Sequence, residues 1–167
     1  SEVLSKIQTT ARVFPTATGR DCTTALCGAG IIDAAAAVLS AGGGLPTVIA
    51  TGDEIVEPEA ELPPGRVRNV NEYLLAALAT RCGAIVHDYG VIGDDSDVLG
   101  RTLERGLAEN DVVFVSGGSS KGAKDLTRAA FEAIPGAEIL FHGISIAPGK
   151  PTLLAKIGGK ALMGVPG

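Results

Sequence analysis

Aromatic residues are scarce in this sequence of 167 residues, which contains four Phe, two Tyr and no Trp. Because 46% of the residues are nevertheless apolar, we expect a core built from Ala, Val, Ile and Leu. The length suits one ordinary domain with a buried core rather than two full domains. The 23 glycines favour loops between aliphatic elements, which is typical of an α/β protein.

Long apolar runs, export signals and paired cysteines are also lacking. No stretch reaches the ~18 to 20 consecutive apolar residues of a membrane span, and no segment has the basic, apolar and small-residue order of a signal peptide. Cys22, Cys27 and Cys82 form neither a CxxC pair nor a metal-binding spacing. An odd number of cysteines without an export signal predicts reduced thiols and a cytoplasmic location.

The net charge of −5 argues against a general nucleic-acid binder, but the charge is unevenly distributed. Residues 1–111 carry 8 Lys or Arg against 16 Asp or Glu, whereas residues 112–167 carry 6 against 3. The last third of the chain is therefore its basic part. This asymmetry is either ordinary scatter of surface charge or a sign that the last third faces an anion.

From Leu45 onward, the spacing of apolar residues alternates between the periods of strand and helix. This order predicts an α/β three-layer sandwich, with a mostly parallel sheet covered by helices on both faces and a C-terminal hairpin. Strands are predicted at 47–51, 84–92, 111–116 and 138–146, helices at 71–82, 97–110 and 125–134, and the hairpin at 152–156 and 160–165.

Two further features of this pattern concern the helix starts and the first residues of the chain. Asn71 is predicted to cap the first of these helices, and the carboxylates of residues 94–97 suit the positive end of the second. Residues 31–40 predict another helix, whereas 1–30 have no sustained period. We therefore divide the chain into residues 1–45, an N-terminal extension or the remnant of a neighbouring domain, and the domain 46–167.

Three loops that leave predicted strands contain residues suited to binding. They begin at Gly52-Asp53-Glu54, at Gly117-Gly118 and around Pro148-Gly149-Lys150-Pro151. In parallel sheets, ligands bind beyond the carboxyl ends of the strands. The three loops therefore predict a single site at one edge of the sheet.

The segment Ser116-Gly117-Gly118-Ser119-Ser120-Lys121-Gly122 brings backbone N–H groups and hydroxyls close to any anion at this edge. The helix that follows directs its positive end to the same place. The segment does not match the GxxxxGK[ST] phosphate loop, and no GxGxxG is present. A plain tight turn is the alternative interpretation.

Each charged candidate also has a structural and a functional interpretation. Asp53 and Glu54 are either solvated loop residues or oxygen ligands of a magnesium ion that bridges to a phosphate. Asp125 is either a helix cap or a carboxylate that binds a heterocycle or a metal. Lys150, held between Gly149 and Pro151, is the lysine best placed to bind an anion. His87 and His142 fall in predicted strands and pair with no catalytic partner.

Several motifs, taken together, resemble the molybdopterin-binding domain of the molybdopterin molybdotransferases (MoeA and the E domain of gephyrin). Their order and spacing carry the resemblance, which covers about Thr47 to Gly167. The motifs are Thr51-Gly52-Asp53-Glu54, Asn71 at a helix start, Asp94-Asp95, the segment 116–122 followed by Asp125, Pro148-Gly149-Lys150-Pro151 and Gly164-Val165-Pro166-Gly167.

The resemblance implies an enzyme that inserts molybdate into adenylylated molybdopterin with loss of AMP, aided by Mg²⁺. It assigns Asp53, Asp125 and Lys150 to catalysis and Asp53 and Glu54 to the metal. The residues that would bind the pterin and its phosphate are Thr51, Gly52, Gly117, Gly118, Ser119, Ser120, Pro148 and Gly149. It also implies a homodimer of a longer protein, contacts with other proteins of molybdenum cofactor biosynthesis, and neither nucleic-acid nor membrane partners.

Two alternatives stay open within the same fold. Many members of the family carry basic residues where this chain has Gly143 and Ala147, which leaves a non-catalytic molybdopterin-binding or sensing module as an alternative. The other is an ATP-dependent molybdopterin adenylyltransferase of the MogA type, whose loop usually reads GGTG. CinA-type proteins share the TGDE opening but usually carry GGLGPT in place of residues 117–122. Proteins of the MogA type lack the PGKP string. The PGKP string and the final GVPG string of this chain together favour the molybdotransferase.

Overall fold

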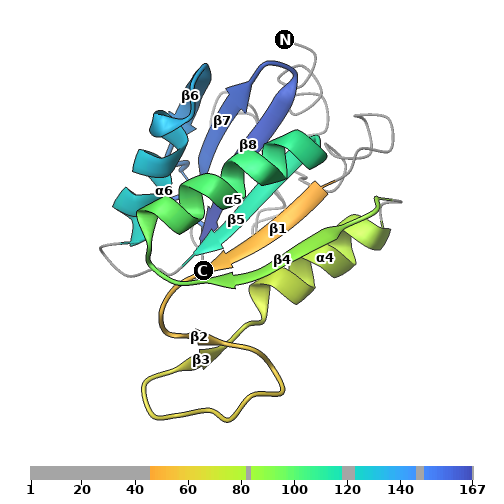
Figure 1. The fold of residues 1–167 in the computed structure, drawn as a ribbon, viewed down its shortest axis with the longest axis vertical. Helices are drawn as coiled ribbons and strands as arrows, with labels where there is room; N and C mark the ends of the chain where they lie inside the picture. Colours follow the sequence, from red (N-terminus) through yellow and green to blue (C-terminus); the bar gives the residue numbers. More distant parts are fainter. Residues whose placement is uncertain (1–45, 82–83, 118–122, 146–148, 167) are drawn as a thin grey trace, which may run out of the picture.

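The computed structural model describes residues 46–81, 84–117, 123–145 and 149–166. Its core is a six-stranded sheet in the order β4-β1-β5-β8-β7-β6, which confirms the predicted α/β class (Figure 1). The predicted helix at 31–40 lies outside the described residues. The strands of this sheet are β1 (Pro46–Thr51), β4 (His87–Ile92), β5 (Val112–Gly117), β6 (Ala137–His142), β7 (Leu153–Ile157) and β8 (Lys160–Pro166).

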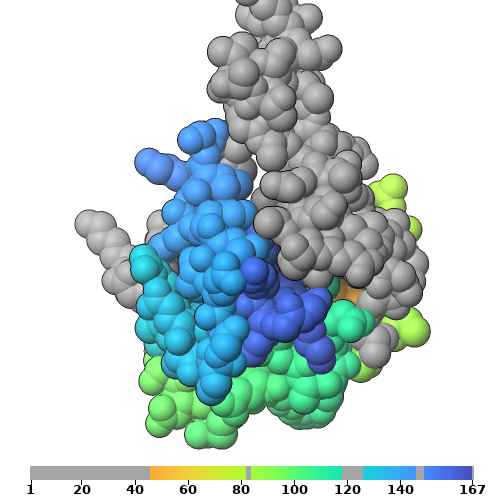
Figure 2. All heavy atoms as spheres, turned by 90° about the horizontal axis from the view of Figure 1, so that it is seen from above, coloured from red at the N-terminus to blue at the C-terminus, as the bar shows by residue number. Residues whose placement is uncertain are grey.

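Strands β4, β1, β5 and β8 are parallel to one another, and the hairpin partner β7 runs antiparallel to both β8 and β6. The predicted hairpin is thus confirmed, but its position differs from a simple closing element. It lies between β5 and the fourth predicted strand, so that β8 pairs with β5 and β6 becomes an edge. Figure 2 shows β6, β7 and β8 as one continuous block beside α5 (Ser96–Glu109).

The burial of β1 and β5 explains why these two strands could be predicted from the sequence. All six residues of β1 are buried, and the four central residues of β5 are buried as well. Strands covered on both faces need continuous apolar runs, which is what these two segments contain. Strand β4 begins at His87 rather than at 84, and the Ala84 N–H donates instead to the Ala79 carbonyl at 3.1 Å.

The described part of the chain contains three helices, α4 (Asn71–Arg81), α5 (Ser96–Glu109) and α6 (Ala123–Ala133). Asp95 caps α5, since its side chain accepts hydrogen bonds from the N–H groups of Asp97 and Val98, both at 2.9 Å. The cap predicted at Asn71 is displaced by one residue. Asn71 is the first helical residue, because Leu74 N–H donates to the Val70 carbonyl at 3.0 Å.

The helices cover both faces of the sheet, as predicted. Leu99, Leu103 and Phe131 of α5 and α6 are fully buried on one face, where they pack with Ile49 and Leu162 of the sheet. On the other face, Ala79 of α4 joins a second cluster with the strand residues Val48, Phe114, Leu154 and Met163. Figure 1 shows α5 and α6 in front of the sheet and α4 behind its β4 edge.

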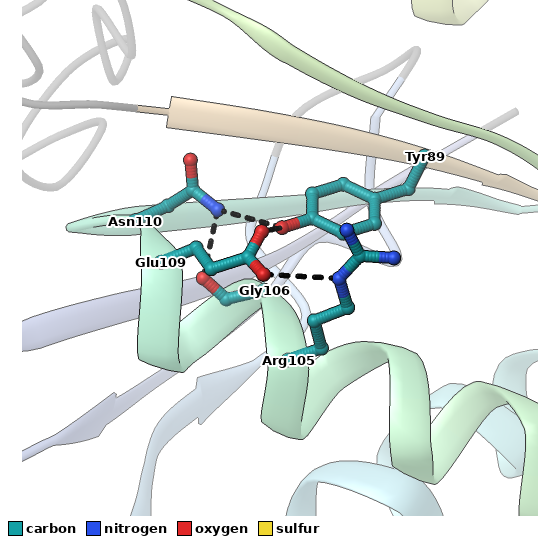
Figure 3. A network of polar contacts seen from close by, with 5 residues as sticks. All are labelled: Tyr89, Arg105, Gly106, Glu109 and Asn110. Carbon is teal, nitrogen blue, oxygen red and sulfur yellow. Dashed lines mark hydrogen bonds and ion pairs between the residues drawn. The ribbon is translucent and has the colours of Figure 1, made fainter.

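The edge strand β4 is attached to α5 by a polar network (Figure 3). The Tyr89 hydroxyl donates to Glu109, which also receives Arg105 Nε at 3.0 Å, and the Arg105 guanidinium lies 5.0 Å from the centre of the Tyr89 ring. Asn110, which is 2% exposed, donates to the Tyr89 hydroxyl at 3.3 Å and to the Gly106 carbonyl at 2.9 Å. These contacts fix the β4 edge against the end of α5.

The segment between β1 and α4, predicted as a polar loop, contains two very short parallel strands, β2 (Ile55–Val56) and β3 (Val67–Arg68). They project beyond the ends of β1 and β4 (Figure 1). Hydrogen bonds from Val67 N–H to the Glu54 carbonyl (2.8 Å) and from Asn69 N–H to the Val56 carbonyl (2.7 Å) connect the two ends of the segment. This pairing places Asn69 and Asn71 near the carboxyl end of β1.

No helix within the described ranges is long and apolar enough to cross a membrane.

Candidate functional site

The carboxyl ends of the parallel strands meet at one edge of the sheet, as the sequence predicted for the first two loops. Thr51 lies directly opposite Gly117 in the pairing of β1 with β5, and Gly117 lies opposite Pro166 in the pairing of β5 with β8. On the other side, Thr51 is opposite Ile92 of β4. The loops that begin at Gly52, Gly93 and Gly117 therefore leave the sheet side by side.

The third predicted loop lies at the same edge of the sheet but farther from β1 than the first two. Leu153, the first residue of β7, is level with Gly164, and Gly164 is level with Val115. The turn that contains Gly149 and Lys150 thus lies at this edge, and the Ile144 N–H donates to the Lys150 carbonyl at 2.8 Å. Three strand spacings, about 14 Å, separate β7 from β1, so the loops that contain Lys150 and Asp53 leave the sheet from well-separated strands.

Two of the predicted glycines are required by close approaches. A Cβ on Gly117 would lie 2.1 Å from the Thr51 Oγ1, and no side chain fits there without a shift. Gly52 has φ of +141°, a conformation that favours glycine, and a Cβ on it would lie 2.8 Å from the Glu54 Oε2. Gly52 N–H also donates to the Ile92 carbonyl at 3.0 Å.

Asp53 joins the loop after β1 to the loop after β4. Its Oδ1 accepts a hydrogen bond from the Asp94 N–H at 3.0 Å, and a Cβ on Gly93 would lie 2.8 Å from the same oxygen. Burial raises the pKa of Asp94, and the negative charges of Asp53 and Glu54 raise it further. Three carboxylates are thus close enough to repel one another, which a bound cation would relieve.

A cavity of about 230 Å³ opens beside these residues. Its polar lining comes from Thr51 and Ser116, which are 2% and 5% exposed, and from Asn69 and Asn71. Neither the Thr51 nor the Ser116 hydroxyl makes a hydrogen bond to another described residue. The remaining lining residues are Ala50, Glu54, Ile55, Val67, Arg68, Val70 and Gly117. A pocket with apolar walls and a few convergent polar groups is typical of a small-molecule site.

Several predicted site residues lie outside the described part of the chain. These are Gly118, Ser119, Ser120 and Pro148, and the side chain of Asp125 also lies outside it, although its backbone belongs to α6. Their predicted roles stay predictions. Among the residues described, the structure brings together Thr51, Gly52, Asp53, Glu54 and Gly117 and places Gly149 and Lys150 farther along the edge.

Sequence reasoning missed the contribution of the segment before α4. Asn69 is not among the predicted site residues, yet it is 3% exposed and lines the cavity. For Asp94, the sequence indicates only a favourable charge at a helix start and not the contact with Asp53. The missing information is the pairing of β2 with β3 for Asn69 and the position of β4 beside β1 for Asp94, and neither is a property of the local sequence.

Comparison with known proteins agrees with this architecture. Residues 47–167 match the family model described as "Probable molybdopterin binding domain". The chain belongs to this family. The molybdopterin molybdenumtransferase of Staphylococcus epidermidis is 38% identical over 120 residues, which are 72% of this chain and 28% of that protein. The enzyme of the same name from a Nostoc species is 35% identical over 108 residues, 65% of this chain and 24% of that protein.

Solved structures show the same relationship. A molybdopterin biosynthesis MoeA protein from Pyrococcus horikoshii has a TM-score of 0.65 and 37% identity, and the match covers 79% of this chain and 34% of that one. The CinA protein from Thermoplasma acidophilum, at 21% identity and a TM-score of 0.50 over 74% of this chain and 88% of that one, shares the fold alone. This chain therefore spans about a quarter to a third of the length of its molybdopterin-related relatives.

Proposed function

We propose that this molybdopterin-binding domain acts in molybdenum cofactor biosynthesis as part of an enzyme that inserts molybdate into adenylylated molybdopterin and releases AMP. The observation that carries the proposal is the register of Thr51 opposite Gly117, beside a cavity lined by Thr51 and Ser116. The identity of 38% to a named molybdenumtransferase supports the choice of reaction.

The described residues are suited to hold an elongated anionic ligand. The Thr51 and Ser116 hydroxyls, which line the cavity, would donate hydrogen bonds to phosphate oxygens. Lys150, in the turn before β7, would contact a different part of the ligand. The substrate and molybdate are both anionic, so the positive charge of Lys150 would favour their binding.

The carboxylates near Asp53 fit a magnesium ion shared with the ligand. No group of three or more His, Cys, Asp or Glu forms a complete metal site within the described ranges. Mg²⁺, however, is usually held by one or two carboxylates together with substrate phosphates and water. Asp53, with Glu54 and Asp94 nearby, would provide those carboxylates. When bound, the ion would supply positive charge against the phosphate oxygens.

Gly117→Ala in the full-length protein tests this location of the site. We expect binding of molybdopterin, measured by calorimetry with Mg²⁺, to weaken at least tenfold, because the added methyl group would displace Thr51 from the cavity wall. Gly100→Ala is the matched control, since a Cβ there meets no atom within 4 Å. Equal affinity of the Gly117 variant and the wild type would exclude this part of the edge as the binding site.

A binding module without transfer activity is favoured by one observation. Gly143, where many relatives carry a basic residue, has φ of +94°, and its N–H donates to the Thr152 carbonyl at 2.8 Å. A lysine at this position would be strained, so the chain is built around the absence of that charge. Tight binding of molybdopterin by the full-length protein without release of AMP from the adenylylated form would identify such a module. Transfer of AMP from labelled ATP to the pterin would identify an adenylyltransferase instead.

A further inference from the structure

Helix α4 buries a carboxyl group on its inner side and exposes apolar side chains on its outer side. Glu72 is 4% exposed, whereas Tyr73, Leu74 and Leu78 are all more than 40% exposed. The Glu72 Oε2 accepts a hydrogen bond from the Asn69 Nδ2. The Glu72 Oε1 is buried and receives no donor from any described residue. Burial of an ionised carboxylate with one bare oxygen is costly, so this arrangement suits a protonated side chain.

The groups around Glu72 also favour its protonated form. Asp88 of β4 is its hydrogen-bonding neighbour, and Glu57 adds a second negative charge from the segment after β2. Glu57 in turn accepts a hydrogen bond from the Tyr73 hydroxyl at 3.1 Å. Burial raises the pKa of Glu72 to about 7, and the hydrogen bond that protonated Glu72 donates to Asp88 contributes to this rise. The same hydrogen bond lowers the pKa of Asp88.

These contacts form a chain from the sheet edge to the cavity. Asp88 lies on the edge strand β4, Glu72 lies in the first turn of α4, and Asn69 lies between β3 and α4. Asn69 has little freedom, because it is 3% exposed and its N–H is bound to the Val56 carbonyl at 2.7 Å. Asn69 is one of the residues that line the cavity, together with Thr51 and Ser116. The orientation of the Asn69 amide is therefore set by Glu72.

We propose that Glu72 is a positioning residue, which holds the Asn69 amide in the wall of the cavity through a carboxyl group shared with Asp88. The proposal rests on the proposed function in one respect, that the cavity binds molybdopterin. When Glu72 loses its proton, it can no longer donate to Asp88 and the two carboxylates repel each other. The first turn of α4 and Asn69 then lose their fixed position, and the affinity of the cavity for its ligand decreases.

The first test follows Asn69 itself and needs no ligand. In the wild type, we expect the side-chain amide resonances of Asn69 to titrate between pH 5.5 and 8.5 with a midpoint near 7. Glu72→Gln keeps an acceptor for Asn69 and a donor for Asp88 at every pH, so the titration should disappear in that variant. Glu104→Gln, on the exposed side of α5, is the matched control and should titrate like the wild type. Asn69 resonances that do not change with pH in the wild type, or that still titrate in Glu72→Gln, would overturn the proposal.

The second test measures molybdopterin binding by calorimetry in the full-length protein. We expect the wild-type affinity to fall about tenfold between pH 6.5 and 8.5 relative to Glu72→Gln. The comparison with Glu72→Gln removes the titration of the ligand's own phosphate. Glu72→Ala should bind weakly at both pH values, with its fold checked by circular dichroism. Identical pH profiles for the wild type and Glu72→Gln would contradict the positioning role. Absence of binding to every variant would instead contradict the proposed function. In that case the Asn69 resonances would still decide whether Glu72 positions Asn69.

Discussion

At the scale of single residues, Asp53 contributes charge rather than shape to the sheet edge. Its Oδ1 already accepts the Asp94 N–H, and an asparagine oxygen accepts that hydrogen bond equally well. The negative charge of Asp53 repels the neighbouring Asp94 carboxylate and contributes to its raised pKa. Removal of the charge therefore separates the structural role of Asp53 from its proposed role beside a cation.

Asp53→Asn should lower the pKa of Asp94 and leave the fold unchanged. In the full-length protein we expect release of AMP in the presence of Mg²⁺ and molybdate to fall by at least about a hundredfold, because a group that stabilises charge in the transition state contributes on that order. Proton resonances of Asp94 and an assay of AMP measure the two effects. Asp97→Asn, which also removes a charge near the start of α5, is the control. A rate equal to that of the wild type would remove Asp53 from the reaction.

The buried carboxyl of Glu72 makes the stability of the fold depend on pH in a definite direction. Because its pKa is raised from 4.5 to about 7 in the folded state, the folded protein binds more protons than the unfolded chain between these values. The free energy of unfolding therefore falls as the pH rises from about 4.5 to 7 and is constant above, as far as this group is concerned. Between pH 5 and 8, the free energy of unfolding of Glu72→Gln should fall by about 1 to 3 kcal/mol less than that of the wild type. Urea unfolding at both pH values measures the difference.

At the scale of elements, the sequence predicted what local physics determines. Asp95 was among the carboxylates expected at the start of α5, and it proves to be the cap because its side chain reaches two free N–H groups of the first turn. The cap predicted at Asn71 lies one residue too far along the chain, since the Val70 carbonyl already accepts a helical hydrogen bond from the Leu74 N–H. The short strands β2 and β3 were not predicted, because two-residue pairs leave no periodic signal.

The cap of α5 provides a quantitative test at this scale. Asp95→Ala should lower the free energy of unfolding by about 1 kcal/mol, since two N–H groups of the first turn lose their acceptor. Asp95→Asn keeps the capping oxygen and should recover most of the loss. Chemical denaturation of the three proteins, with unchanged slopes, checks this order. An alanine variant as stable as the wild type would show that solvent replaces the cap.

The order of the strands was the part of the fold that the sequence did not reveal. The strands of the six-stranded sheet, including the hairpin, were predicted from their own residues, but their neighbours depend on contacts between distant segments. Leu162 of β8 illustrates the point, because it is fully buried in a cluster with residues of α5, α6 and β5, which precede it by tens of residues. The candidate site was predictable to the extent that parallel strands end together. Asn69 and Glu72 were not, because nothing in the local sequence shows that they are buried.

At the scale of the whole molecule, one sheet with two packed faces carries the stability. Leu162→Ala should destabilise the fold by about 2 to 5 kcal/mol, because it leaves a cavity in the larger of the two clusters. Leu74→Ala is the matched control, since Leu74 is 55% exposed, and it should change the stability by less than about 0.5 kcal/mol. Urea midpoints of both variants decide. Similar losses for both would mean that the outer side of α4 is packed in solution.

The position of β8 has a consequence for how the chain folds during synthesis. This strand is the last of the sheet in sequence but lies between β5 and β7, in its interior. Until residue 166 has left the ribosome, β5 has an unpaired edge and neither β6 nor β7 can join the parallel strands. Emerging chains must therefore hold β1, β4 and β5 together as an incomplete sheet with an exposed apolar edge, a species prone to aggregation. Folding of this domain is a late event, completed only when the final strand is inserted, and chaperones would have the whole period of its synthesis in which to act.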